Sequence, residues 1–190
     1  IVMGRVLVSS LSEFNVRALL GMDFCAQNEI ILSSSASKAR RLMIDDSFHL
    51  IIINSPLEDE YGGELALHAA EKTTAGVMIF VKSSSYDIAV HKLEPYGVMV
   101  IGKPCSSEYA RQSVRLISAT ASRMQAMKKK TLQLQSRINE IKIIDRSKCV
   151  LMQYLGVTEE GAHKYIEKEA MDSRRSRYDV ALEILKTYES

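Results

Sequence analysis

Residues 50–54 read LIIIN, a run of four large aliphatic side chains that is closed by the polar Asn54. Four similar short runs, rich in Val and Ile, lie elsewhere in the N-terminal part of the chain: Arg5–Ser10, Glu29–Ser33, Gly76–Val81 and Gly97–Ile101. Because these runs are apolar on both faces, they are typical of strands buried within a parallel sheet.

The segments between these runs carry apolar residues at the spacing of one helix face. The four stripes are Val16/Leu19/Leu20/Phe24, Ala36/Ala39/Leu42/Met43, Leu65/Ala69/Ala70 and Ile88/Ala89/Leu93. Alternating strands and helices predict an α/β fold, a doubly wound five-stranded parallel sheet that ends near residue 118. Right-handed crossovers would place helices on both faces of this sheet.

A long helix is predicted next, because neither Gly nor Pro occurs between Cys105 and Leu155. Within it, six residues recur at alternating spacings of three and four: Met124, Met127, Thr131, Leu134, Ile138 and Ile141. This heptad seam predicts a parallel two-stranded coiled coil and therefore a homodimer. The alternative is that the helix packs on its own α/β domain. The Lys128–Lys130 run is a solvated helix face or takes an electrostatic part in binding.

The C-terminal residues predict a small all-α domain of three helical pieces, the first continuing the coiled coil. Gly156 ends the long helix, Thr158 caps the next, and Ser176 with Asp179 forms a capping box for the last. The expected packing residues are Met152, Ala162, Tyr165, Ile166, Ala170, Val180, Ala181, Ile184, Leu185 and Tyr188. The predicted divisions are residues 1–118, 119–145 and 146–190.

Composition and motifs exclude several classes of function. Hydrophobic residues make up 46% and charged residues 25% of the 190 residues, the balance of a globular protein. No apolar run approaches the ~18 residues of a membrane span and no leader peptide is evident, so a cytoplasmic protein without a membrane partner is expected. The sequence lacks metal-binding Cys or His spacings, nucleotide-binding glycine motifs and a catalytic set, so neither a metal, a cofactor nor an enzyme is expected.

Two family resemblances emerge from these residues. Residues 5–118 resemble a response-regulator receiver domain, with Asn54 closing the third strand, Ser83 after the fourth, and Lys103-Pro104 after the fifth. Residues 130–188 resemble an ANTAR domain, an RNA-binding output module, through IDRSKCVLMQYLGVTEEGAHKYIEKEAM at 144–171 and YDVALEIL at 178–185. Together they imply a transcription antiterminator of the two-component response-regulator type, with strand order 2-1-3-4-5 in the receiver.

The receiver resemblance also implies a degenerate phosphorylation pocket, formed by Ser9, Ser10, Asn54, Ser83 and Lys103. Asn54 stands where receivers carry the phosphoryl-accepting aspartate, and its neutral amide cannot act as that nucleophile. Ser9 and Ser10 replace the acidic pair that holds Mg²⁺. We therefore expect no phosphorylation by the usual route and control by a sensor, another regulatory protein or a ligand. Lys103 is expected to bond Asn54 and the Ser9/Ser10 backbone.

The ANTAR resemblance implies binding of paired hairpins in nascent mRNA by a dimer. Phosphate contacts require basic side chains, and the candidates are Arg146, Lys148, Lys164, Lys168, Arg174, Arg175 and Arg177. An alternative function is a protein–protein interaction or sequestration module that binds no nucleic acid. DNA binding through a helix-turn-helix is a weaker third hypothesis.

The net charge of +2 is a sum of unlike parts. Residues 1–118 carry 11 basic and 13 acidic side chains, residues 119–145 carry 6 and 2, and residues 146–190 carry 8 and 8. The predicted RNA-binding domain is therefore not basic as a whole, although whole-domain basicity is the usual mark of nucleic-acid binding. Any binding must depend on local clusters, on shape and on both subunits.

Overall fold

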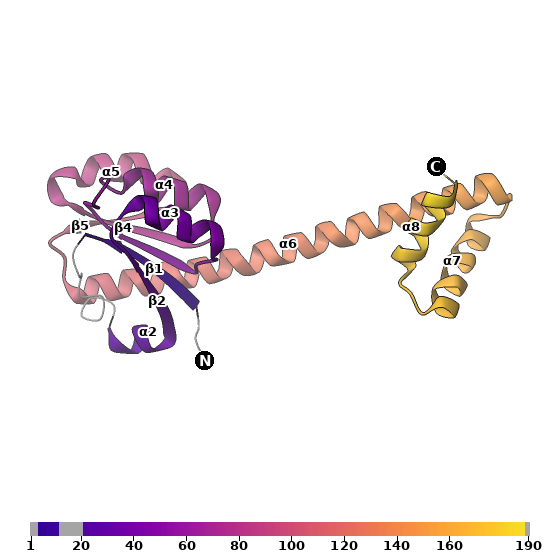
Figure 1. The fold of residues 1–190 in the computed structure, drawn as a ribbon, viewed down its shortest axis with the longest axis horizontal. Helices are drawn as coiled ribbons and strands as arrows, with labels where there is room; N and C mark the ends of the chain where they lie inside the picture. Colours follow the sequence, from indigo (N-terminus) through magenta and orange to yellow (C-terminus); the bar gives the residue numbers. More distant parts are fainter. Residues whose placement is uncertain (1–3, 12–20, 189–190) are drawn as a thin grey trace. The chain divides into compact units, whose positions relative to one another are not determined.

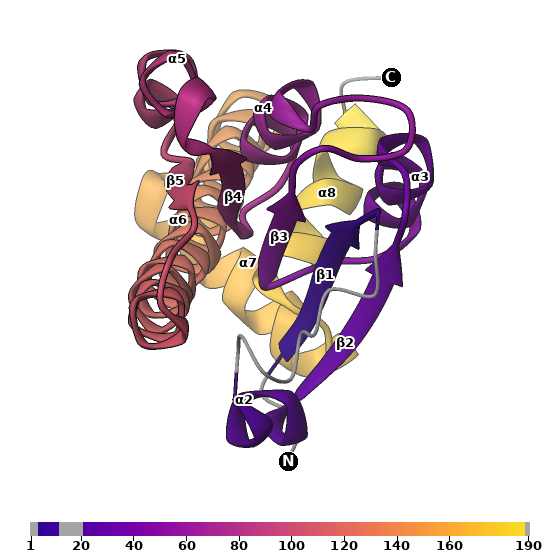
Figure 2. The same cartoon turned by 90° about the vertical axis from the view of Figure 1, so that its left-hand side faces the viewer.

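A five-stranded parallel sheet forms the centre of the first of two units into which the chain divides, residues 1–127 and residues 128–190. The structure, a computed structural model, describes residues 4–11 and 21–188. The strands are β1 (Gly4–Ser10), β2 (Asn28–Ser33), β3 (Leu50–Asn54), β4 (Gly76–Lys82) and β5 (Met99–Lys103). Their order is β2-β1-β3-β4-β5, which confirms the predicted topology (Figure 2).

The last strand begins two residues later than its sequence predicts. A 3-10 turn, η2 (Glu94–Tyr96), precedes it, and Gly97 follows that turn with φ 76°. This positive φ is a left-handed conformation that Gly adopts without steric cost. Gly97 thus serves as a turn residue rather than as the first residue of the strand.

Helices cover both faces of the sheet, as expected for a doubly wound fold (Figure 1). Helices α3 (Ala36–Asp45), α4 (Gly63–Lys72) and α5 (Tyr86–Leu93) pack on one face, and α2 (Met22–Gln27) and the start of α6 (Ser107–Leu155) pack on the other. Alternation along β3 divides the two cores, with Ile51 and Ile53 in the first and Leu50 and Ile52 in the second.

Two of the predicted helix stripes differ from the structure or cannot be compared with it. Val16, Leu19 and Leu20 lie outside the described residues, whereas Phe24 packs on the second core from α2. Ile88 was expected on a buried stripe but is 74% exposed, because α5 turns Ala89, Val90 and Leu93 toward the sheet instead.

The long helix α6 is confirmed and begins at Ser107, where the Ser106 hydroxyl accepts a bond from the Tyr109 amide at 3.1 Å. Both of the predicted divisions, at 118 and at 145, fall within α6. Gly156, with φ 65°, ends this helix as predicted. No helix in the described part of the chain is long and apolar enough to cross a membrane.

Helices α7 (Glu159–Ser173) and α8 (Arg177–Tyr188) complete the second unit. The Thr158 hydroxyl accepts a bond from the Gly161 amide at 3.1 Å, which confirms the predicted N-cap. The Ser176 hydroxyl accepts from the Asp179 amide at 3.1 Å and donates to the Asp179 carboxylate at 2.6 Å. The Asp179 side chain therefore bonds the capping hydroxyl instead of the backbone amide of a complete capping box.

The core of the second unit joins α6, α7 and α8 through the following buried residues: Val150, Leu151, Ala162, Ile166, Ala170, Val180, Ile184 and Leu185. Two predicted packing residues were wrong, since Tyr165 is 48% and Met152 is 40% exposed. Val150 and Leu151 carry the contact from α6 instead of Met152, and Ala162 and Ile166 carry it from α7 instead of Tyr165.

Candidate functional site

The carboxyl ends of the strands bring three of the five predicted pocket residues into one chain of hydrogen bonds. Parallel pairing places Asn54 beside Ser10. The Asn54 Nδ2 donates to the Ser10 Oγ at 3.0 Å, and the Lys103 Nζ donates to the Asn54 Oδ1 at 2.9 Å. This confirms the expected bond between Lys103 and Asn54. The second bond of Lys103 goes to the Ser55 carbonyl at 2.6 Å and not to the expected Ser9/Ser10 backbone. Ser55 directly follows Asn54, so its carbonyl lies within reach of the same ammonium.

Ser9 and Ser83 do not join this chain of bonds. The Ser9 side chain is fully buried, and its hydroxyl has no hydrogen-bond partner among the described residues. Ser83 begins the 3-10 turn η1 (Ser83–Ser85), and its hydroxyl donates to the backbone carbonyl of Lys103 at 2.6 Å. Ser83 therefore holds the end of β5 rather than facing the Lys103 ammonium.

The pocket presents neutral oxygens to Lys103. Burial lowers the pKa of Lys103, and the nearby charge of Lys82 lowers it further. Within residues 4–11 and 21–188 there is no group of His, Cys, Asp or Glu that could hold a metal ion. A hydroxyl, an amide and a carbonyl are weak substitutes for the carboxylates that bind Mg²⁺ in proteins.

The acidic residues that follow β3 are committed to structural contacts that sequence reasoning missed. The Asp59 carboxylate accepts bonds from the amides of Ala36 and Ser37, at 2.7 and 2.9 Å, and from the Ser37 hydroxyl at 2.7 Å. These bonds lower the pKa of Asp59 to about 2. Glu60 pairs with Arg40 at 2.6 Å. Asp59 thus serves the first turn of α3, where amides are otherwise unpaired.

In the helical unit, several of the predicted RNA-binding residues form ion pairs with carboxylates. Lys148, whose side chain is only 15% exposed, lies 2.8 Å from Asp145 and 3.3 Å from Glu159, and its pKa is raised chiefly by the bond to Asp145. The other three pairs are Lys164–Glu160, Arg175–Glu183 and Arg177–Glu167. Their positive charges are therefore largely balanced within the unit.

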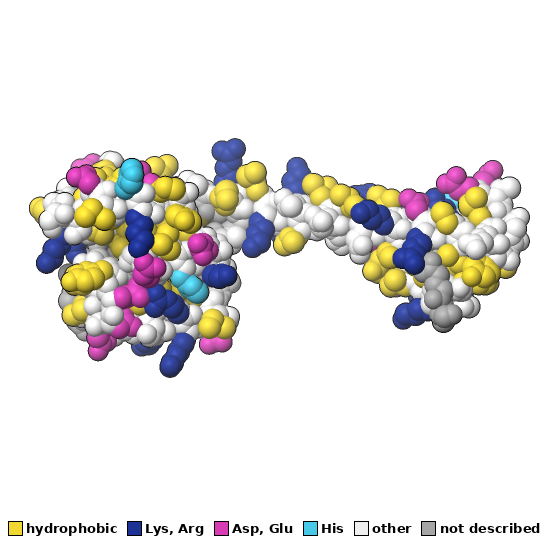
Figure 3. Space-filling model, turned by 90° about the horizontal axis from the view of Figure 1, so that it is seen from above, with side chains coloured by type: hydrophobic (Ala, Val, Ile, Leu, Met, Phe, Trp, Pro, Cys, Tyr) yellow, Lys and Arg dark blue, Asp and Glu magenta, His cyan; other side chains and the backbone are white. Residues whose placement is uncertain are grey.

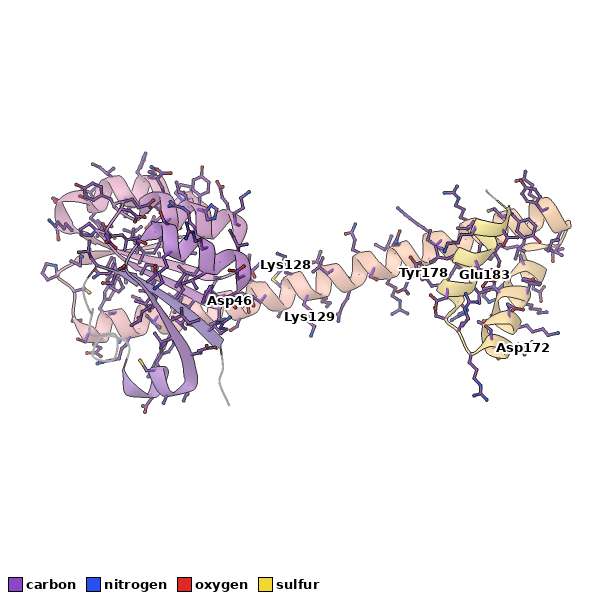
Figure 4. The ribbon with its side chains drawn as sticks, in the orientation of Figure 1. Asp46, Lys128, Lys129, Asp172, Tyr178 and Glu183 are labelled. Atoms are coloured by element: carbon purple, nitrogen blue, oxygen red, sulfur yellow. The ribbon has the colours of Figure 1, made fainter. Side chains whose placement is uncertain are left out.

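The remaining candidates, Arg146, Lys168 and Arg174, are all exposed. Arg174 ends α7 in a left-handed conformation with φ 54°, and its amide donates to the Met171 carbonyl at 3.3 Å. Lys168 lies one turn beyond Tyr165, so the exposed ring and the ammonium occupy the same face of α7. Figure 4 labels Asp172 near the end of α7, Tyr178 in the first turn of α8 and Glu183 in the middle of α8.

The predicted heptad seam is exposed in the single chain. Its five apolar side chains have exposed fractions between 52% and 57%, and Thr131 is exposed as well. Figure 3 shows hydrophobic and basic side chains along the exposed part of α6. The two units bury other faces of this helix, through Ala110 and Val114 in the first and Val150 and Leu151 in the second.

Comparison with known proteins agrees with both resemblances. Residues 132–185 match the model of the ANTAR domain. The transcriptional regulatory protein PdtaR of Mycobacterium tuberculosis is 25% identical over 138 residues, which are 73% of this chain and 67% of that protein. The aliphatic amidase regulator of Pseudomonas aeruginosa is 28% identical over 138 residues, 71% of this chain and 69% of that protein.

Solved structures resemble the first unit in fold. The signal receiver domain of a LuxO-type repressor protein from Vibrio parahaemolyticus has a TM-score of 0.57 and 21% identity, covering 65% of this chain and 96% of that one. A response-regulator receiver domain protein from Clostridium thermocellum has a TM-score of 0.54 and 18% identity, covering 66% and 98%. At these identities the likeness establishes the receiver-like fold alone.

Proposed function

This chain carries an ANTAR domain at its C-terminus behind a receiver-like fold, and we propose from this premise that it is an RNA-binding regulator of transcription antitermination. It binds paired hairpins in nascent transcripts as a homodimer and so keeps a terminator hairpin from forming. The observation that carries the proposal is the ANTAR match over residues 132–185. The two related regulators, from Mycobacterium tuberculosis and Pseudomonas aeruginosa, support it.

The α7 face that carries Tyr165 and Lys168, with Arg174 at the end of the helix, is the proposed contact with the hairpin loops. Loop bases stack on exposed aromatic rings, and phosphates attract cations. Tyr165 is exposed and lies one turn from Lys168, so a base and its phosphate would meet both groups. Arg146 remains a proposed contact. Lys148, Lys164, Arg175 and Arg177 contribute less, because carboxylates already balance their charges.

The receiver-like unit is proposed to transmit a signal without phosphorylation at Asn54. The Lys103 ammonium is occupied by Asn54 and the Ser55 carbonyl, at 2.9 and 2.6 Å. A partner protein, such as a sensor, or a small ligand would then change the activity of the helical unit. The exposed seam from Met124 to Ile141 is the proposed dimer interface, because a second helix packed along it would bury its apolar side chains.

A binding selection tests the function. The full chain is incubated with a pool of RNAs that carry two hairpins with randomised loops, and retained RNAs are then measured by gel shift. We expect retained two-hairpin RNAs to bind more tightly than their single hairpins and than duplex DNA, with affinity falling as salt rises. Equal binding to duplex DNA would indicate a DNA-binding regulator instead.

A protein-interaction module without nucleic acid is the second candidate. The equal numbers of basic and acidic side chains in residues 146–190, eight of each, favour it. The ion pairs of Lys148, Lys164, Arg175 and Arg177 reduce the attraction to phosphate further. Failure of the selection to retain any RNA would contradict the first proposal and support this one.

A further inference from the structure

The heptad register places basic side chains beside the dimer seam. With Thr131 and Ile138 at position a, and Leu134 and Ile141 at position d, the flanking e and g positions follow from the sequence. Between residues 128 and 142 they are Lys128, Lys130, Gln135, Arg137 and Lys142. The four basic residues among them are here called the cationic flank. All four are exposed.

The cationic flank opposes dimer formation. In a parallel two-stranded coiled coil, each g residue faces the e residue of the partner's next heptad. Arg137 then faces the partner's Lys142, and Lys130 faces the partner's Gln135, so one pair repels and the other is neutral. An antiparallel arrangement would also bring only basic and neutral side chains together. The apolar seam therefore attracts a second copy while its edges repel that copy.

No carboxylate within the second unit relieves this repulsion. Glu140 is the only acidic residue between 128 and 142, and it occupies position c, on the outer side of the coiled coil. Among the described residues, no ion pair to a member of the flank is found, whereas Lys148, Lys164, Arg175 and Arg177 are all paired. Lys128 and the neighbouring Lys129 extend from α6 (Figure 4). The flank thus places four exposed basic side chains along residues 128–142 of α6, where Glu140 is the only carboxylate.

The spacing of the flank fits an extended polyanion. Lys128 and Lys142 are fourteen residues apart, which is about 21 Å along a helix. Each edge of a dimer would carry four cations over that length, two from each chain. A nucleic-acid backbone supplies several phosphates over the same distance. An RNA strand along this edge would neutralise the repulsion that separates the two copies.

We propose that the cationic flank binds the phosphate backbone of the RNA and that this contact strengthens the dimer. The inference rests on the proposed function. It adds where the RNA backbone lies on the protein and that RNA binding and dimer formation strengthen each other. Because coupling between two equilibria is reciprocal, RNA that favours the dimer is itself bound more tightly by the dimer. Unbound regulator then remains largely monomeric at low salt, and the transcript assembles it.

Salt dependence gives the first test, by sedimentation equilibrium of the full chain in 50 mM and 500 mM KCl. Salt screens like charges, so we expect the dimer dissociation constant to fall by roughly three- to tenfold as salt rises. Adding a 20-nucleotide polyuridylate at 50 mM KCl is expected to produce the dimer, because backbone contacts are independent of sequence. A dimer that weakens as salt rises would overturn the repulsive flank.

A double variant, Lys130→Gln/Arg137→Gln, gives the second test. We expect it to form a tighter dimer at low salt than the wild type, yet to bind polyuridylate at least ~10-fold more weakly. Two charges are lost on each edge of the dimer, so the slope of log affinity against log salt for one bound strand should decrease by about 1.4, at 0.7 per phosphate contact on single strands. The matched control, Lys38→Gln/Arg41→Gln, removes the same charge from exposed positions on α3 and should change neither quantity.

The outcomes separate this inference from the proposed function. If the wild type binds neither the selected two-hairpin RNA nor polyuridylate, the proposed function fails, and the inference fails with it. If the wild type binds the selected RNA but the double variant keeps its affinity and salt slope, only the inference is overturned. The same follows if polyuridylate does not bind. Equal promotion of the dimer by duplex DNA would overturn the assignment of the flank to the RNA backbone.

Discussion

The ammonium nitrogen of Lys103 lies 2.9 Å from the Oδ1 of Asn54, so the cation at the carboxyl edge of the sheet is bound to a neutral amide. The amide in turn donates to the Ser10 hydroxyl at 3.0 Å. Lys103, Asn54 and Ser10 therefore satisfy one another without a carboxylate, a phosphoryl group or a metal ion. The bonds that the Lys103 ammonium donates to Asn54 and Ser55 therefore both go to neutral oxygens.

Phosphorylation is the first property that this arrangement predicts. We expect intact-mass measurement to show no phosphoryl adduct after incubation of the wild type with a small phosphodonor and Mg²⁺. The Asn54→Asp variant should also remain unmodified, because Ser9 and Ser10 supply no carboxylate to hold the metal. The new carboxylate would instead pair with Lys103 and raise its pKa.

The matched variant for this experiment is Ser10→Asp/Asn54→Asp, which supplies both a nucleophile and a metal ligand. We expect an adduct from this double variant alone. A stoichiometric adduct in the wild type, mapped to any residue of the pocket, would refute the proposed phosphorylation-independent control.

Acid stability is predicted to depend on Asp59. Its pKa of about 2 lies below the ordinary value of 3.8, so its ionised form is stabilised by folding. That stabilisation is fully present above pH ~4 and is lost as the pH falls from 3.8 toward 2. Asp59→Asn should lower the melting temperature at pH 6 and flatten its decline between pH 4 and 2.

The control for Asp59 is Glu71→Gln, an exposed carboxylate on α4 of the same unit. Thermal melts of both variants across the acidic range make the comparison. If Asp59→Asn and Glu71→Gln melted at the same temperature at every pH, the bonds from the Ala36 and Ser37 amides to Asp59 would not contribute to stability.

Much of this architecture is predictable from local sequence, and the exceptions share a physical cause. The LIIIN run and its four counterparts predict the strands, and the absence of Gly and Pro from 105–155 predicts α6, because both signals are local. Ala162, Ile166 and Tyr165 share one helical stripe, but the sequence does not show which of them lies at the centre of the buried face and which at its edge. Tyr165 lies at the edge, so its predicted place in the core is wrong.

Contacts between distant segments were the other source of error. Nothing in the local sequence indicates that Lys148 meets Glu159 across the bend between two helices, or that Asp59 caps a helix 22 residues earlier in the chain. Basic residues were therefore predicted as RNA contacts by their charge alone. The Lys164–Glu160 pair lies one helical turn apart and could have been found from the sequence, whereas the partners of Arg175 and Arg177 emerge only from the fold.

Dimerisation is predicted to depend on the seam and not on exposed leucines in general. Leu134 and Leu132 are 54% and 61% exposed and lie two residues apart, but only Leu134 occupies a heptad seam position. Leu134→Asp would bury a carboxylate against a second helix, which is unfavourable, whereas Leu132→Asp places it in water. We expect the first variant to be monomeric by sedimentation at 500 mM KCl and the second to dimerise like the wild type.

Packing of α6 on its own domain would give a different outcome for this pair. If the seam contacts the same chain in solution, Leu134→Asp would lower thermal stability at a protein concentration where the wild type is already monomeric. A lower stability of the monomer, rather than a lost dimer, would contradict the coiled-coil interface.

Arg174 offers a substitution that separates RNA binding from stability. Its φ of 54° places it in the left-handed region at the end of α7, a position where Gly is favoured over residues with a side chain. Arg174→Gly should therefore stabilise the second unit by about 0.5–1 kcal/mol. Arg174→Ala keeps the backbone strain and should not stabilise it. Both variants remove the same exposed cation, so both should bind the selected hairpin RNA more weakly, with a smaller salt slope.

Urea unfolding and gel shifts on the same preparations measure the two effects. Arg175→Ala serves for comparison, because Arg175 pairs with Glu183 and bonds the Asp179 carbonyl, so its loss should destabilise the α7–α8 turn first. Weaker RNA binding by a more stable Arg174→Gly protein cannot result from unfolding. Undiminished affinity in both Arg174 variants would instead remove this residue from the RNA interface and leave Tyr165 and Lys168 as the α7 contacts.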